Sequence, residues 1–456
     1  MTDPTTTLWF ESALLETGWA RQVRLVLRSG AIVGVEHDVA RAADEPANGP
    51  AVPGLPNLHS HAFQRGMAGL AEVRGPSGDS FWTWREVMYR FLERLGPDEV
   101  EAIAAQAYVE MLEAGFTRVG EFHYLHHDRD GAAFSDPAEM AARIAAAAGE
   151  SGIGLTLLPV FYAHSGFGGA AATPGQARFL HDIDGFARLL EASRKAVASL
   201  PHAVVGLAPH SLRAVTPPQL TALVGLAGEG PIHIHIAEQT QEIQDCQAWS
   251  GARPVEWLLA NAPVDPRWCL VHATHVSPDE ISDMALSGAV VGLCPITEAN
   301  LGDGLFLAPE FQQQGGRFGI GSDSNVLIDV AEELRTLEYG QRLARRTRNV
   351  MAAEPGDSTG AGLYRAALAG GGQALGVGAS RLAVGEPADI VSLDRDHPVL
   401  VGRQGDALID SWAFAGRRDV VDNVWRAGVR LVSGGRHRAR DAIAARYRRT
   451  LARILA

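Results

Sequence analysis

The segment NLHSHAFQRG, residues 57–66, contains two histidines separated by one residue, directly after the apolar run PGLP. Side chains two residues apart on a β-strand point to the same side, so His59 and His61 can direct two imidazoles towards one ion. A pair of this kind is weak evidence by itself, because a metal site needs further ligands from other parts of the chain.

Two later segments supply candidate ligands. HIHIAE contains His233 and His235, and GSDSN contains Asp323. If the site lies at the carboxyl ends of the strands, His235 is the expected ligand and His233 is the expected packing residue. Three neutral nitrogens and one carboxylate suit Zn²⁺ or Fe²⁺ and can leave a position for water. The predicted ligands are His59, His61, His235 and Asp323.

Two further side chains could make such a site hydrolytic. Glu238, three residues after His235, could pass protons between water and a leaving group, and His272 in LVHATH could hold or polarise a metal-bound water. A bound metal lowers the pKa of its water from 15.7 towards about 7. The plainer alternatives are a surface carboxylate at Glu238 and a satisfied core histidine at His272.

Eight short runs rich in Val, Ile and Leu could position these side chains, with helical stretches between several of them. Such a pattern predicts a parallel sheet buried on both faces, and eight units fit a (β/α)8 barrel whose active site lies at the carboxyl ends of the strands. The runs are residues 51–61, 117–125, 152–162, 203–212, 231–238, 268–276, 288–296 and 316–324.

Most of these runs finish with polar side chains, which we expect to meet at one mouth of the barrel. The alternative, that polar residues only mark the ends of strands, is weakened by the size of the set. Its members are His59, His61, Glu121, His123, His210, His235, Glu238, His272 and Asp323.

Both ends of the chain alternate apolar and polar residues around Gly turns, as half-exposed antiparallel strands do. We therefore predict a small β-sandwich domain built from both termini, with a closing amphipathic helix at 441–456. The glycine run in ALAGGGQALG, residues 367–376, lacks the Lys-Ser/Thr ending of a phosphate loop and is predicted to be a connection. The predicted limits are 1–52 and 380–456 for the β domain and 53–379 for the barrel.

Composition excludes several classes of function. The formal net charge of −13 argues against nucleic-acid and membrane-surface partners, so we expect a small-molecule substrate, with local arginines if it is anionic. The sequence shows neither an apolar run long enough to cross a bilayer nor a secretory signal, and its three cysteines are scattered. A cytoplasmic location is the expectation.

Together the motifs resemble the amidohydrolase superfamily: a His-x-His after the first strand, later strand histidines, a final Asp and a split β domain that ends in PADIVSLD. The two-metal members of that superfamily carry a carboxylated lysine after strand four. Here the only lysine, Lys195, lies in a helix-like stretch before that strand. The resemblance therefore implies a single-metal deaminase. The motif HxAE, which places Glu238 three residues after His235, is similar to the deaminase-type branch of the superfamily and supports this interpretation.

Longer motifs, among them NLHSHAFQRGMAGL, FWTWREVMYRF, VGEFHYLHHD, APHSLRAV and LCPITEANLGDG, are similar to the formimidoylglutamate deiminase family. The resemblance implies hydrolysis of N-formimino-L-glutamate to N-formyl-L-glutamate and ammonia in histidine degradation, one Zn²⁺ per subunit with Fe²⁺ possible, and a homodimer. Asp323 and His272 would help to deprotonate the metal-bound water, and Glu238 would protonate the departing nitrogen. Arginine forks bind carboxylates well, which suits a dicarboxylate substrate. The implied substrate contacts are Gln64, Arg85, Tyr124, His210 and Arg213.

Three alternatives stay open. Another deaminase of the same superfamily could act on a cyclic amidine such as guanine or a triazine, which would need aromatic or amide groups around a planar base. Hydrolysis of a carbamoyl group or ring amide is weakened by the missing lysine. A non-catalytic metal-binding protein would bind metal without turnover, and the full set of ligands with Glu238 and His272 disfavours it.

Overall fold

The chain folds around a barrel of parallel strands, in a computed structural model that describes residues 5–75 and 79–456. Each of the eight predicted runs supplies one strand position, and the fourth position consists of two short strands. These strands are β6 (Leu55–Ser60), β7 (Phe116–His123), β8 (Gly154–Phe161), β9 (Val204–Val205) with β10 (Ala208–Pro209), β11 (Ile232–Ile236), β12 (Trp268–His272), β13 (Val290–Leu293) and β14 (Arg317–Ile320).

The barrel is closed by backbone pairing between neighbours. β6, β7, β8 and β10 pair in parallel, as do β11 to β14. Parallel bridges join the two halves, at Ser211 with His235 on one side and at Ser60 with Asp323 on the other. The predicted (β/α)8 barrel is thereby confirmed.

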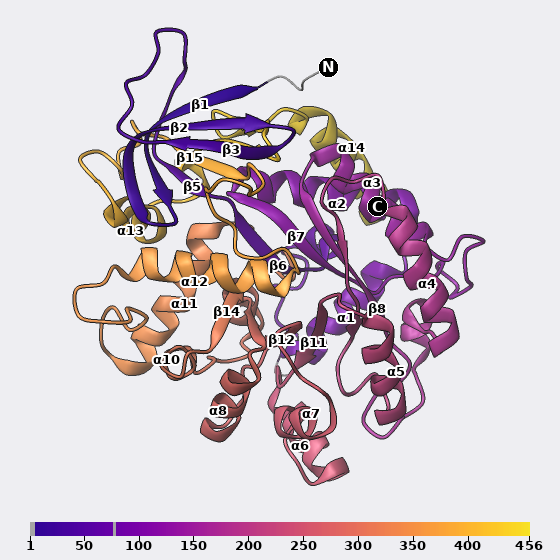
Figure 1. Ribbon diagram of the computed structural model, residues 1–456. Helices are drawn as coiled ribbons and strands as arrows, with labels where there is room; N and C mark the ends of the chain where they lie inside the picture. Colours follow the sequence, from indigo (N-terminus) through magenta and orange to yellow (C-terminus); the bar gives the residue numbers. More distant parts are fainter. Residues whose placement is uncertain (1–4, 76–78) are drawn as a thin grey trace.

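Helices cover the outside of the barrel, so that strands such as β7, β8, β11 and β12 are buried along their whole length (Figure 1). Several of these helices, among them α2, α5, α7 and α8, begin with Pro in the first turn, where the missing N–H costs nothing. The surrounding helices are α2 (Pro97–Glu113), α3 (Glu139–Ser151), α4 (Ile183–Ala196), α5 (Pro217–Ala227), α6 (Thr240–Ser250), α7 (Pro254–Asn261), α8 (Pro278–Ser287), α9 (Pro295–Leu301), α10 (Ala308–Gln313), α11 (Val330–Arg345) and α12 (Thr359–Ala374).

A second sheet lies beside the barrel and combines both ends of the chain, as predicted; its strands are antiparallel except where β1 pairs in parallel with β4 and β5. Its strand order is β18-β17-β16-β15-β5-β1-β2-β3, with β4 paired to β1. Phe10 and Leu25 share one apolar core with Ile390 and Trp425, so strands from the two termini pack on each other. The strands are β1 (Thr6–Leu15), β2 (Gly18–Arg28), β3 (Ala31–Glu36), β4 (Ala47–Asn48), β5 (Ala51–Pro53), β15 (Ile390–Leu393), β16 (Val421–Arg426), β17 (Val429–Ser433) and β18 (Arg436–His437).

The predicted closing helix forms as α14 (Arg440–Leu455) and packs against α2. A further helix, α13 (Asp406–Ala415), packs on α11 and α12. Residues 1–4 of the predicted first segment lie outside the described residues, and the domain limits stay a prediction. Among the residues that the structure describes, none of the helices has both the length and the apolar character needed to span a bilayer.

The glycine run at Gly370–Gly372 was wrongly predicted to be a connection, because it lies inside helix α12. Glycine lowers helix propensity, but here the helix runs close to barrel strands. A Cβ at Gly370 would lie 1.9 Å from the carbonyl oxygen of Phe318 in β14, and one at Gly371 would lie 3.1 Å from Cβ of Pro56. The glycines therefore allow α12 to contact the barrel at short distance.

Candidate active site

Four predicted ligands converge at the carboxyl ends of β6, β11 and β14. His59 and His61 come from the end of β6, His235 comes from β11, and Asp323 follows β14. Nε2 of His59 lies 3.2 Å from Nε2 of His61 and 3.0 Å from Nε2 of His235. Oδ1 of Asp323 lies 3.3 Å from Nε2 of His61. The structure thus brings one ligand atom of each residue to a common point.

Hydrogen bonds made by Nδ1 leave the Nε2 lone pairs of His61 and His235 free to bind a cation. Burial lowers the pKa of His59 to about 3, and it lowers the pKa of His61 and His235 as well. Nδ1 of His61 lies 2.9 Å from the carbonyl oxygen of Phe122, and Nδ1 of His235 lies 3.2 Å from that of His210, so each Nδ1 carries the proton. The remaining Nε2 lone pairs make a site that fits a divalent cation.

The backbone around Asp323 fixes this geometry. Its N–H donates to the carbonyl oxygen of His59 (3.0 Å), and its carbonyl oxygen accepts from the N–H of His61 (2.9 Å). Asp323 has a positive φ of 44°, which non-glycine residues rarely adopt. The side chain of Asn325 donates to the carbonyl oxygens of both His61 and Asp323. This local strain is held in place by hydrogen bonds to two of the candidate ligands.

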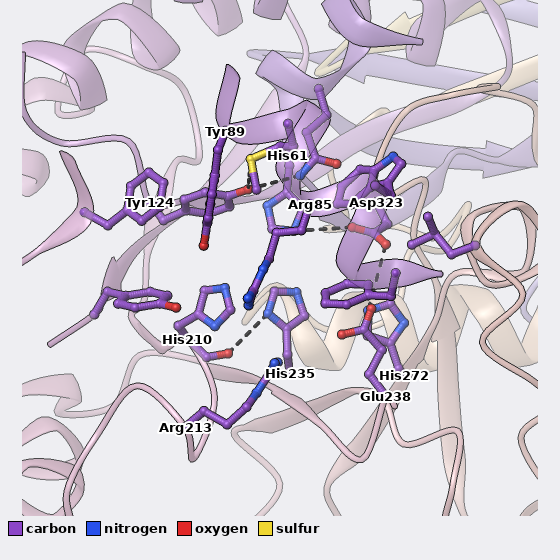
Figure 2. A pocket seen from close by; sticks show the side chains of 17 residues that line it. His61, Arg85, Tyr89, Tyr124, His210, Arg213, His235, Glu238, His272 and Asp323 are labelled. Carbon is purple, nitrogen blue, oxygen red and sulfur yellow. Dashed lines mark hydrogen bonds and ion pairs between the residues drawn. The ribbon is translucent and has the colours of Figure 1, made fainter. Parts of the chain in front are cut away.

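His272 and Glu238 lie beside the cluster of candidate ligands. Nε2 of His272 lies 3.7 Å from Oε1 of Glu238 and 3.8 Å from Oδ2 of Asp323. Nδ1 of His272 lies 3.2 Å from Oε1 of Glu298 on α9, so the imidazole is held between carboxylates. Figure 2 shows His272, Glu238 and Asp323 together at one side of the pocket.

These neighbours set the proton affinities of the two side chains. Although burial opposes it, the Glu238 and Asp323 carboxylates and the hydrogen bond to Glu298 raise the pKa of His272 to about 10. Burial raises the pKa of Glu238 to about 7, against the positive charges of His272 and Arg213. A carboxyl group that titrates near neutral pH can both accept and donate a proton, as a general acid–base group must.

The residues predicted to contact substrate line the same pocket (Figure 2). Arg85 comes from α1 (Phe81–Leu92), and Arg213 follows β10. Gln64, in the short helix η1 (Ala62–Met67), donates from Nε2 to the Tyr124 hydroxyl at 3.0 Å, and its own carbonyl oxygen is buried without a partner among the described residues. The complete predicted set at the pocket wall is Gln64, Arg85, Tyr124, His210 and Arg213.

The two arginines point into the pocket from opposite sides (Figure 2). Arg213 is 8% exposed, and Nε of its buried guanidinium has no hydrogen-bond partner in the part of the chain that the structure describes. Within that same part neither Arg85 nor Arg213 forms an ion pair with a carboxylate. Buried charges are normally paired, so an anionic ligand would complete this end of the pocket.

Two residues expected at the mouth point elsewhere. Phe122, between Glu121 and His123, packs against the rings of His59 and His235, so its neighbours in β7 face the other side of the strand. Oε1 of Glu121 accepts from the N–H of Ala62 outside the pocket. The expectation that Glu121 and His123 join the mouth was therefore wrong, because alternation along a strand admits only every second side chain.

Sequence reasoning also gave no role to Glu298 and Trp82. Glu298 stands in LCPITEANLGDG, where one turn of α9 brings its carboxylate to the N–H of Cys294 (2.9 Å) and to His272. Trp82 stands three residues before Arg85 in FWTWRE, a spacing of about one helical turn. The motifs were visible in the sequence, but only the fold shows which groups these two side chains contact.

Lys195 lies where the sequence predicts, on helix α4 and away from the site. Its ammonium group forms an exposed ion pair with Glu191 at 3.4 Å. No lysine is therefore available to bridge two metal ions, since Lys195 is the only one in the chain.

Comparisons with known proteins agree with this architecture. The model of the amidohydrolase family matches residues 51–431, and that of the N-terminal domain of formimidoylglutamate deiminase HutF matches residues 5–48. A formimidoylglutamate deiminase from Pseudomonas aeruginosa is 52% identical over 98% of this chain and 99% of its own length.

Solved structures show the same relationship. The crystal structure of an amidohydrolase from Brucella melitensis has 55% sequence identity and a TM-score of 0.96, covering 99% of this chain and 100% of its own. An adenosine deaminase from Xanthomonas campestris with bound zinc shares the fold, with a TM-score of 0.80 and 23% identity over 98% of both chains. The chain therefore belongs to the amidohydrolase family and, within it, to the formimidoylglutamate deiminases.

Proposed function

We propose that this protein hydrolyses N-formimino-L-glutamate to N-formyl-L-glutamate and ammonia, a step of histidine degradation. The observation that carries the proposal is the joining, in one pocket, of a three-histidine, one-aspartate cluster with two arginines that lack carboxylate partners among the described residues. The first suits hydrolysis and the second suits a substrate with two carboxylates. The 52% identical relative from Pseudomonas aeruginosa supports the same reaction.

We assign the binding of a metal ion to four residues, each of which directs one ligand atom to a common point. They are His59, His61, His235 and Asp323. One Zn²⁺ per subunit fits three nitrogens and a carboxylate, and Fe²⁺ fits the same set. When bound, such an ion would lower the pKa of water and so supply hydroxide at neutral pH. The zinc in the Xanthomonas campestris adenosine deaminase supports the choice of metal.

Arg85 and Arg213 bind the glutamate part of the substrate in this proposal. Each guanidinium can donate two parallel hydrogen bonds to a carboxylate, which fixes orientation as well as affinity. Tyr124, His210 and Gln64 offer further hydrogen bonds along the wall nearer the histidine cluster. The formimino carbon is thereby placed between the cluster and Glu238.

The remaining chemistry is proton transfer by side chains of this chain. Water adds to the formimino carbon, Asp323 accepts the proton that leaves its oxygen, and the protonated imidazole of His272, held between carboxylates, donates a hydrogen bond that steadies this oxygen. Glu238, with a pKa of about 7, delivers a proton to the terminal nitrogen. A second proton, lost by the hydroxyl group on the same carbon, passes through the Glu238 carboxylate to this nitrogen as the C–N bond breaks, so ammonia leaves with both protons of the water and the formyl group stays on the glutamate nitrogen.

The test is ammonia release by purified protein of measured metal content, with N-formimino-L-glutamate as substrate. N-formimino-glycine and guanine serve as comparison substrates, and a chelated sample serves as the metal control. We expect turnover of the glutamate compound that is lost with the metal. Absence of turnover by metal-loaded protein would contradict the proposed substrate.

Deamination of a cyclic amidine is the second candidate. It draws support from a 28% identical 5-methylthioadenosine/S-adenosylhomocysteine deaminase of Natronomonas pharaonis. Two arginines at the end of the pocket are poorly suited to a neutral planar base, so we rank this activity second. Turnover of guanine without turnover of the glutamate compound would reverse that order. The homodimer and the cytoplasmic location stay predictions from the sequence.

A further inference from the structure

Trp82 on α1 lies against both arginines of the pocket. The guanidinium carbon of Arg85 lies 4.5 Å from the centroid of the Trp82 ring, and that of Arg213 lies 5.7 Å from it. Arg85 stands one turn further along the same helix, whereas Arg213 comes from the segment after β10. One indole ring therefore contacts two cations that are far apart in the sequence.

Before substrate binds, the positive charges of Arg85 and Arg213 repel each other. Both guanidinium groups face one pocket, and neither forms an ion pair with a carboxylate within the described residues, although the Glu242 and Glu238 carboxylates lie near enough to raise the pKa of Arg213. Like charges at short range repel each other, more strongly where protein displaces water. The face of an indole ring carries partial negative charge and attracts a guanidinium group, and this attraction grows when the pair is shielded from water. Trp82 can thus offset part of the repulsion.

We infer that Trp82 is a positioning residue that holds the Arg85 and Arg213 guanidinium groups at the spacing required by a substrate with two carboxylates. The inference rests on the proposed function and names Trp82 as the residue that makes the pocket selective for a substrate with two carboxylates. The described residues that line the pocket include Phe81, Trp84 and Arg85 from α1 but not Trp82, so its action passes through the arginines. Without the ring, Arg85 would keep only its contact with Tyr89, whose ring centroid lies 5.7 Å from the guanidinium carbon, and Arg213 could adopt other rotamers that binding would have to reorder.

Substitution of Trp82 tests this role through the separation of KM from kcat. We expect Trp82→Leu to raise KM for N-formimino-L-glutamate roughly tenfold, the size of a shielded cation–π contact, and to leave kcat within about twofold. The reason is that the arginines hold a part of the substrate that does not change during the reaction. Trp82→Phe, which keeps an aromatic face, should recover most of the loss. KM for N-formimino-glycine should change less, because this compound has one carboxylate.

A double-mutant cycle distinguishes this role from a purely structural one. Trp82→Leu should have a much smaller effect on KM in an Arg85→Gln background than in the parent, because one of the two stacked cations is gone. A loss of the same factor in both backgrounds would overturn the inference. Thermal denaturation and metal content of each variant show whether the fold is intact, and Trp82→Met replaces the leucine variant if that one unfolds.

Binding of glutarate, measured by calorimetry, separates the inference from the proposed function. If the parent releases no ammonia from the glutamate compound, the proposed function fails, and the role of Trp82 is judged on the glutarate Kd alone. A roughly tenfold weaker Kd in Trp82→Leu, restored in Trp82→Phe, supports the inference. Equal Kd values for the parent and Trp82→Leu overturn it, as do equal KM values where turnover is observed.

Discussion

Replacement of Glu298 by glutamine removes one negative charge from the contact that orients His272. Oε1 of Glu298 accepts from the N–H of Cys294 at 2.9 Å and lies 3.2 Å from Nδ1 of His272. Glutamine keeps the length of the side chain, but its amide can present either an oxygen or an NH₂ group to the imidazole. We therefore expect the pKa of His272 to fall and its ring to lose a fixed orientation, while the fold and the cluster of candidate ligands persist.

The size of the effect follows from that one contact. A hydrogen bond to a charged group contributes about 1.5–3 kcal/mol, and each 1.4 kcal/mol corresponds to about tenfold in rate. His272 also contacts Glu238 at 3.7 Å and Asp323 at 3.8 Å, and these carboxylates remain in the variant. We expect kcat for N-formimino-L-glutamate to fall about 10- to 100-fold, with KM changed much less, because Glu298 does not line the pocket wall near the arginines.

The assay is steady-state ammonia release by Glu298→Gln and by the parent at equal metal content. Glu191→Gln is the matched control, since Glu191 is an exposed carboxylate on α4 that pairs with the Lys195 ammonium group, and its loss should leave kcat unchanged. A kcat equal to that of the parent, in a metal-loaded and folded Glu298→Gln, would refute the reasoning. It would show that other contacts suffice to orient His272.

Three other outcomes are expected. Arg213→Ala should raise KM for N-formimino-L-glutamate about 10- to 100-fold by removing a charge-assisted carboxylate contact, and metal analysis should show an unchanged metal content. His235→Ala should lose both bound metal and turnover, and a metal-loaded, fully active variant would disprove the ligand assignment. Burial lowers the pKa of His123 to about 4 in the folded protein, compared with about 6.5 in the unfolded chain. Below pH 6.5 the unfolded chain therefore binds a proton at His123 that the folded protein does not bind, and the free energy of unfolding falls as the pH falls. His123→Phe should remove this loss, so denaturant titrations at pH 7 and pH 5 should show the free energy of unfolding of the parent falling by about 2 kcal/mol more than that of the variant.

The barrel could be predicted from the sequence because its strands carry a strong local signal. Most are short runs of branched apolar residues, and polar residues at their carboxyl ends, such as His235 and Asp323, mark the mouth, although Glu121 and His123 do not. The order of such strands in a closed barrel follows the chain, so no long-range pairing had to be guessed. The coming together of His59, His61, His235 and Asp323 could be predicted for the same reason.

Side chains that act through a neighbour could not be predicted in this way. Glu298 belongs to helix α9, which follows β13, and its contact with His272 depends on how α9 packs beside β12, the strand before β13. Trp82 reaches Arg213 only because α1 packs over the segment after β10. Gly370 misled local reasoning, since its lack of a side chain serves the approach of α12 to Phe318 and not a loop.

The sheet shared by the two ends of the chain has a consequence for how the protein is made. β5 (Ala51–Pro53) is completed by β15 (Ile390–Leu393), so the inner strand of the N-terminal part has an unpaired edge until nearly the whole barrel has been synthesised. Phe10 likewise waits for Trp425, its ring partner at 5.7 Å. Contacts between such distant segments form slowly, and exposed strand edges promote aggregation. The newly made chain therefore passes through a period in which its first strands depend on rapid barrel folding, or on a chaperone, for protection.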